Sequence, residues 1–111
     1  MQLRRVLNRG LATAVPKRVR IVEVGLRDGL QNEAKPVATA TKLELLDQLA
    51  RSGLKTIEAG SFVSPKWVPQ MADTPQICAE LQKHAKERYP GVTFTALTPN
   101  LKGLIFLLLL L

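Results

Sequence analysis

An arginine and an aspartate stand side by side in the segment EVGLRDGLQNE, residues 23–33. Arg27 carries a permanent positive charge on a planar fork of donors, which suits an enolate or carboxylate oxygen. Asp28 offers a hard carboxylate oxygen of the kind that Mg²⁺ or Mn²⁺ prefers. The pair could therefore approach one substrate oxygen from two sides, Arg27 directly and Asp28 through the metal. The alternative is a surface turn without a chemical role.

The elements that would position this pair alternate along the chain. The predicted order is a strand at 19–25, a helix at 40–52, a strand at 54–59, a helix from Thr74 and a strand at 92–97. This alternation predicts an α/β fold with a parallel sheet and right-handed crossovers. Thr41 and Glu44 match a capping box at the start of the first helix, and Gly53 suits the position just past its end.

The three predicted strands lead into GLRDGLQNE, GSFVSPK and TPNLKG. Ligands of parallel α/β folds bind at the carboxyl ends of the strands, so we expect these segments to share one rim. Glu58 ends the second predicted strand, where an unpaired carboxylate would be costly. We expect it to pair with Arg27, and the alternative is a contact with Lys55 or solvent.

The net charge of +7 comes from the N-terminus. Residues 1–22 hold six basic side chains and no acid, and the rest of the chain is nearly neutral, which argues against a nucleic-acid-binding face. Residues 1–18 are typical of a mitochondrial presequence, because they are rich in arginine and have no continuous apolar core. The alternative is a frayed basic N-terminus.

Three further features of the sequence bear on its possible functions. The single cysteine, Cys78, excludes an internal disulfide and a cysteine-based zinc cluster, and we interpret it as a soft, helix-filling side chain. We interpret His84 as a solvated surface residue. The run LIFLLLLL, residues 104–111, is too short to span a membrane. We interpret it as an aberrant end of an incomplete chain, and the alternative is an apolar tail that docks on a partner.

Three segments carry a resemblance to a known family. VEVGLRDGLQNE, IEAGSFVSPKWVPQMAD and LTPNLKG closely resemble the hydroxymethylglutaryl-CoA lyase family. The likeness covers residues 19–103. The LRDG.Q element alone is shared with isopropylmalate and homocitrate synthases and with carboxyltransferase domains, whereas SFVSPKWVPQMAD is far more specific.

The resemblance implies that residues 19–103 are the N-terminal portion, about three βα units, of a TIM (β/α)8 barrel. It implies an enzyme that uses a divalent cation, Mg²⁺ or Mn²⁺, to cleave 3-hydroxy-3-methylglutaryl-CoA into acetyl-CoA and acetoacetate in leucine breakdown and ketone-body formation. It also implies a mitochondrial matrix location, which agrees with the leader, and a homodimer for the full-length family.

The resemblance also assigns roles to residues of this chain. Asp28 matches the metal-binding aspartate, and Arg27 matches the arginine that contacts substrate and stabilises the enolate. Glu58 matches an acidic residue near that arginine, and Ser61 matches a serine beside the substrate. Two residues are assigned only to the rim, Gln31 and Asn100.

Two departures from the family pattern bear on function. Leu26 stands where the family usually has proline, which removes some rigidity from the turn. The family's other metal ligands, two histidines and an asparagine, and its cysteine-bearing loop have no counterpart in this chain. We therefore expect the chain alone to be inactive and poorly folded. The alternatives are a non-catalytic short form that binds the full-length enzyme and a related carbon–carbon synthase.

Overall fold

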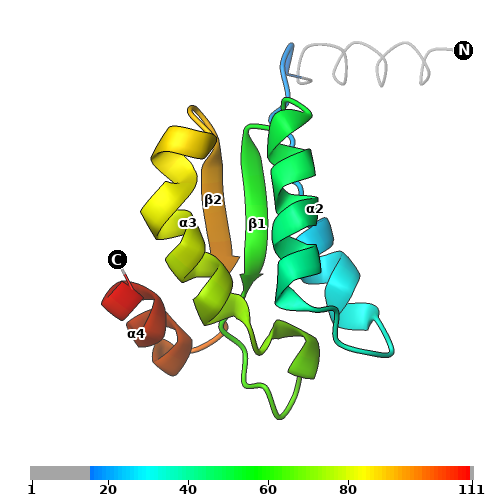
Figure 1. Cartoon of the computed structure of the whole chain (residues 1–111), viewed down its shortest axis with the longest axis vertical. Coiled ribbons are helices and arrows are strands. Elements are labelled where there is room, and N and C mark those ends of the chain that lie inside the picture. Colours follow the sequence, from blue (N-terminus) through cyan, green and yellow to red (C-terminus); the bar gives the residue numbers. More distant parts are fainter. Residues whose placement is uncertain (1–15, 111) are drawn as a thin grey trace, which may run out of the picture.

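Two parallel strands form the centre of the fold, with helices packed on one face (Figure 1). The computed structural model describes residues 16–110. Strand β1 (Thr56–Ser61) pairs with β2 (Thr93–Leu97), and Thr56 lies opposite Thr93 at the start of the register. The pairing shifts by one residue between Glu58 and Gly60, so Ala59 is an extra residue on β1. The predicted α/β order with parallel strands is confirmed.

The strand predicted at 19–25 is reduced to one parallel bridge between Glu23 and Ile57. The amide of Glu23 donates to the Thr56 carbonyl (2.9 Å), and the amide of Glu58 donates to the Glu23 carbonyl (2.8 Å). Val19 is 79% exposed, because nothing in the described part of the chain packs over it. A continuous apolar run forms a strand only where neighbours bury both of its faces. Here Val19, Ile21 and Val22 all remain exposed.

The chain then turns through two short helical segments, η1 (Gly25–Gly29) and η2 (Leu30–Asn32), into helix α2 (Thr39–Arg51). The predicted capping box is wrong. Helix α2 begins two residues before Thr41, and its first turn has no side-chain cap. Gly53 has a φ of +98°, so the glycine predicted past the helix end does adopt the left-handed conformation.

Helix α3 begins at Thr74, as predicted, and ends at Arg88 (Thr74–Arg88). The main core lies between the sheet and helices α2 and α3. It contains Leu46 of α2, Ile57 of β1 and Ile77 of α3, each at most 2% exposed. Leu26 joins this core at 1% exposure, so its side chain is an apolar anchor for the η1 turn.

Helix α4 (Leu101–Leu110) contains the apolar run, and the predicted boundary at residue 104 falls inside this helix. Asn100 caps this helix, because its Oδ1 accepts a hydrogen bond from the amide of Gly103 (2.8 Å). Gly103 lies against Phe62, where an added Cβ would come within 2.7 Å of the Phe62 carbonyl oxygen. None of the helices in residues 16–110 is long and apolar enough to cross a membrane.

Candidate functional site

Arg27 connects the turn after the bridge to the end of β1. Its Nε donates to Glu58 Oε1, and its Nη1 donates to Asp28 Oδ1 at 2.9 Å. The side chains of Arg27 and Glu58 are only 20% and 18% exposed, whereas that of Asp28 is 55% exposed. The predicted pairing of Glu58 with Arg27 is confirmed. A carboxylate on each side fixes the guanidinium plane, while Asp28 stays open to solvent.

The backbone explains why these side chains meet. The amides of Arg27 (3.1 Å) and Asp28 (2.7 Å) both donate to the Val24 carbonyl, which folds η1 back over the end of the sheet. Ile57 and Ala59 pack into the core between the sheet and the helices, and Glu58 lies between them in sequence. Because side chains alternate along a strand, Glu58 faces the side of the sheet that α2 and α3 do not cover.

Gln31 is also part of this cluster, because its Nε2 donates to Asp28 Oδ1 at 3.0 Å. Asn32, which the sequence did not single out, donates from Nδ2 to the Asp28 carbonyl oxygen at 2.7 Å. Asp28 is thus held through both its side chain and its backbone. We refer to Arg27, Asp28, Gln31 and Glu58 as the arginine cluster.

The arginine cluster offers the type of oxygen ligand that a divalent cation prefers, but it does not offer enough of these ligands. Asp28 offers hard carboxylate oxygens, yet residues 16–110 contain no group of three His, Cys, Asp or Glu side chains that could hold a metal. Mg²⁺ needs near-octahedral oxygen coordination, which one carboxylate does not impose. These residues alone therefore do not form a metal site.

Ser61 and Asn100 belong to a second group. Ser61 is 2% exposed, and its amide donates to Thr74 Oγ1 at 3.1 Å. Its hydroxyl is buried without a hydrogen-bond partner in the described part of the chain. Ser61 and Asn100 line a cavity of about 260 Å³ beside α4, whose wall includes Phe62 and Gly103. Asn100 also caps α4, a role that the sequence analysis did not assign to it.

The sequence analysis missed a buried cation. Lys42 of α2 is 2% exposed, and its Nζ donates to the Gln70 carbonyl (2.5 Å) and to Asp73 Oδ1 (2.6 Å). Thr39 Oγ1 donates to the other oxygen of Asp73 (2.8 Å). The side chain of Gln70 donates to the carbonyl of Glu33 (2.5 Å).

We call the residues of this network the lysine clamp: Thr39, Lys42, Gln70 and Asp73. It joins α2, the loop of residues 62–73 and the segment that follows the arginine cluster. One signal was available in the sequence, because Lys42 lies four residues before Leu46 and so falls on the buried face of α2.

Cys78 and His84 lie outside both groups. Burial raises the pKa of the Cys78 thiol to about 11, so this side chain stays a neutral thiol within α3 at neutral pH. His84 Nε2 is 3.7 Å from Glu80 Oε2, and both side chains are nearly half exposed. Neither arrangement points to a catalytic role, which agrees with the interpretation of Cys78 as a filling side chain and of His84 as a surface residue.

Comparisons with known proteins point to one family. A family model described as HMGL-like matches residues 18–103. A Pseudomonas aeruginosa protein, 3-hydroxy-3-isohexenylglutaryl-CoA/hydroxy-methylglutaryl-CoA lyase, is 56% identical over 89 residues, which are 80% of this chain and 28% of the relative. The human mitochondrial hydroxymethylglutaryl-CoA lyase is 52% identical over 101 residues, 91% of this chain and 29% of the relative.

Solved structures agree with the sequence relatives. The crystal structure of hydroxymethylglutaryl-CoA lyase from Pseudomonas aeruginosa matches with a TM-score of 0.74 and 53% identity. The match covers 86% of this chain and 30% of that one. The chain thus spans less than a third of the length of the proteins that it resembles, and its fold corresponds to the N-terminal part of their barrel.

Proposed function

This chain belongs to the HMGL-like family, and from that premise we propose that it forms one wall of the active site of a carbon–carbon lyase. The proposed reaction cleaves 3-hydroxy-3-methylglutaryl-CoA into acetyl-CoA and acetoacetate. The observation that carries the proposal is the arginine cluster, in which Glu58 and Asp28 orient the Arg27 guanidinium at the carboxyl end of a parallel sheet. This is the edge at which barrel enzymes place their chemistry.

The reaction needs a cation of this kind. When the bond between C2 and C3 of the substrate breaks, the C3 hydroxyl gives up its proton and becomes the ketone of acetoacetate. The bonding electron pair passes to C2 and on to the thioester oxygen, which gives an enolate. A fixed guanidinium beside that oxygen stabilises the charge that develops in the transition state. Protonation at C2 then yields acetyl-CoA.

The other candidate residues have supporting roles in this proposal, or none. Glu58 binds Arg27 Nε and so sets the direction in which the remaining donors point. Gln31 holds Asp28 through Oδ1. Ser61 has a buried hydroxyl without a partner in residues 16–110, which leaves it able to bind a polar substrate group. Asn100 is not assigned to catalysis, because it caps α4.

The cofactor and location are also proposals. We propose that Asp28 supplies one oxygen ligand to Mg²⁺ or Mn²⁺, which would polarise substrate oxygens, with the other ligands coming from outside residues 16–110. We propose a mitochondrial matrix location. The human relative is named as mitochondrial, and residues 1–18 have the composition of a presequence, although residues 1–15 lie outside the described part of the chain.

A chimera provides the test of this function. Residues 18–103 replace the matching segment of the Pseudomonas aeruginosa lyase, and acetyl-CoA and acetoacetate are measured after addition of the substrate and Mg²⁺. We expect equal amounts of both products at a rate within about tenfold of the parent enzyme, a modest loss because interfaces between segments are repacked.

The unmodified 111-residue chain is the reference in this assay. We propose that it shows no turnover above its Asp28→Ala variant, because one carboxylate does not hold a catalytic cation. A folded chimera that produces neither acetyl-CoA nor acetoacetate would contradict the lyase proposal. Condensation of acetyl-CoA with a 2-oxo acid by the chimera would favour a related synthase instead.

A further inference from the structure

The backbone of Ser61 is held from two sides at the end of β1. The Ser61 amide donates to Thr74 Oγ1 at 3.1 Å, and the next amide, that of Phe62, donates to the Leu97 carbonyl of β2 at 2.8 Å. The Ser61 hydroxyl has no hydrogen-bond partner within residues 16–110. The direction of this side chain therefore depends on hydrogen bonds of the backbone rather than on one of its own.

Thr74 is the first residue of α3, and it lies against the end of β1 (Figure 1). Its side chain is buried, at 1% exposure. A Cβ added at Gly60 would come within 2.5 Å of Thr74 Oγ1 and within 2.9 Å of its Cγ2. Gly60 thus allows a close approach of helix and strand that a larger residue would prevent. This approach brings the Thr74 hydroxyl within reach of the Ser61 amide.

The lysine clamp fixes the start of α3, and with it Thr74. Asp73 precedes the helix, at the position from which an aspartate usually accepts hydrogen bonds from the first free amides. It makes no such side-chain cap here. Its Oδ1 instead binds the buried Lys42 ammonium (2.6 Å), and its Oδ2 accepts from Thr39 (2.8 Å). The start of α3 therefore cannot move away from α2 without breaking a buried ion pair, which is costly.

We propose that Thr74 is a positioning residue of the lyase reaction, an inference that rests on the proposed function. Its hydroxyl holds the Ser61 backbone and so keeps the Ser61 hydroxyl at the cavity that Ser61 and Asn100 line. Thr74 does not line this cavity, so it acts on the substrate only through Ser61. A hydrogen bond from Ser61 to a polar group present in both substrate and transition state contributes to binding rather than to the chemical step.

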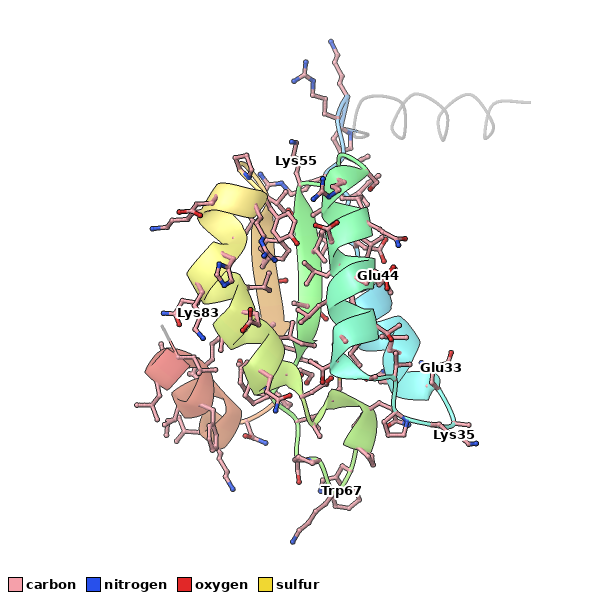
Figure 2. All side chains as sticks on the ribbon, in the orientation of Figure 1. Glu33, Lys35, Glu44, Lys55, Trp67 and Lys83 are labelled. Carbon is pink, nitrogen blue, oxygen red and sulfur yellow. The ribbon has the colours of Figure 1, made fainter. Side chains whose placement is uncertain are left out.

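Kinetics of the chimera separate this role from a purely structural one. Thr74→Val leaves the Ser61 amide buried without an acceptor, so we expect KM to rise about three- to tenfold, the effect of one lost hydrogen bond, with little change in kcat. Thr74→Ser keeps the hydroxyl and should restore the KM of the unmodified chimera. Thr56→Val is the matched control, because Thr56 is also buried but lies at the other end of β1, beside Lys55 (Figure 2). An equal rise of KM in Thr74→Val and Thr56→Val would overturn the inference.

A double variant tests whether Thr74 acts through Ser61. Ser61→Ala removes the hydroxyl that Thr74 positions. We expect Thr74→Val to raise KM in the unmodified chimera but not in the Ser61→Ala background, because the effects of two residues that act as one unit do not add. The same rise of KM in both backgrounds would overturn the inference. Circular dichroism checks the fold of each variant, and Thr74→Ala removes the same hydroxyl if valine at this position prevents folding.

Amide exchange in the full chain gives a readout that does not require lyase activity. We expect nuclear magnetic resonance to show the Ser61 amide exchanging with deuterium oxide about tenfold faster in Thr74→Val than in the unmodified chain, because a buried hydrogen bond is lost. Equal exchange rates would overturn the inference. An active chimera whose KM does not respond to Thr74→Val would also overturn it and leave the lyase function standing. Faster exchange with an inactive chimera would reject the lyase function and support the hold of Thr74 on Ser61.

Discussion

Replacement of Arg27 by lysine is expected to lower the kcat of the chimera by about 10²–10³-fold, with a much smaller change in KM. Lysine keeps the positive charge but carries its donors on one rotatable nitrogen, so it cannot reproduce the fixed geometry in which Arg27 binds Glu58 through Nε and Asp28 through Nη1. The charge would remain near the enolate oxygen but lose its fixed direction. Initial rates of acetoacetate formation at several substrate concentrations give both constants.

Two further variants make this result specific. Glu58→Gln keeps the shape of the partner side chain and removes its charge, so we expect a smaller loss of kcat than for Arg27→Lys. In the double variant Arg27→Lys, Glu58→Gln, we expect the second substitution to add little to the loss caused by the first. Arg20→Lys lies at an exposed position before the bridge and should have no effect. If Arg27→Lys and Arg20→Lys gave the same kcat, Arg27 would not act on the reacting oxygen.

Lys42→Met is expected to lower the free energy of unfolding by about 3–5 kcal/mol, which is the usual cost of removing one partner of a buried ion pair. The Lys42 side chain is 2% exposed, and its removal leaves Asp73 with Thr39 as its only side-chain partner within residues 16–110 while also freeing the Gln70 carbonyl. Urea unfolding of the full chain, followed by circular dichroism, measures this loss. A loss of this size is large enough to unfold a marginally stable domain.

Lys55→Met is the matched control, because Lys55 is exposed just before β1 (Figure 2) and forms no ion pair within residues 16–110. The double variant Lys42→Met, Asp73→Asn should lose less stability than the two single variants added together. Each single variant leaves one charge without its partner, whereas the double variant removes both charges. Equal losses in Lys42→Met and Lys55→Met would show that the lysine clamp does not hold the loop.

The sequence predicted the helices and the order of the parallel segments better than the extent of the first strand. The periodic apolar residues of α2 and α3 find their partners within the described chain, so local pattern and packing agree. Residues 19–25 have the composition of a strand buried on two sides, but only Glu23 pairs with a neighbouring strand, at Ile57 of β1. Composition alone does not reveal whether the covering elements are present.

The candidate site was predictable where chemistry and topology point to the same residues. An acid at the end of a buried strand needs a cation, and Arg27 follows the adjacent segment, so their contact could be expected. The ion pair of Lys42 could not be expected, because lysine is normally exposed and its partner Asp73 lies 31 residues away in sequence. The cap formed by Asn100 was missed because the apolar run after it was not expected to be helical.

Exchange of the methyl protons of acetyl-CoA with deuterium oxide tests the role of the arginine cluster most directly, because it requires only the enolate and not the cleavage of substrate. Nuclear magnetic resonance follows the loss of the methyl signal in the presence of the chimera and Mg²⁺. We expect exchange that Arg27→Lys slows by the same 10²–10³-fold as it slows cleavage. Equal exchange rates in Arg27→Lys and the unmodified chimera would show that Arg27 does not stabilise the enolate.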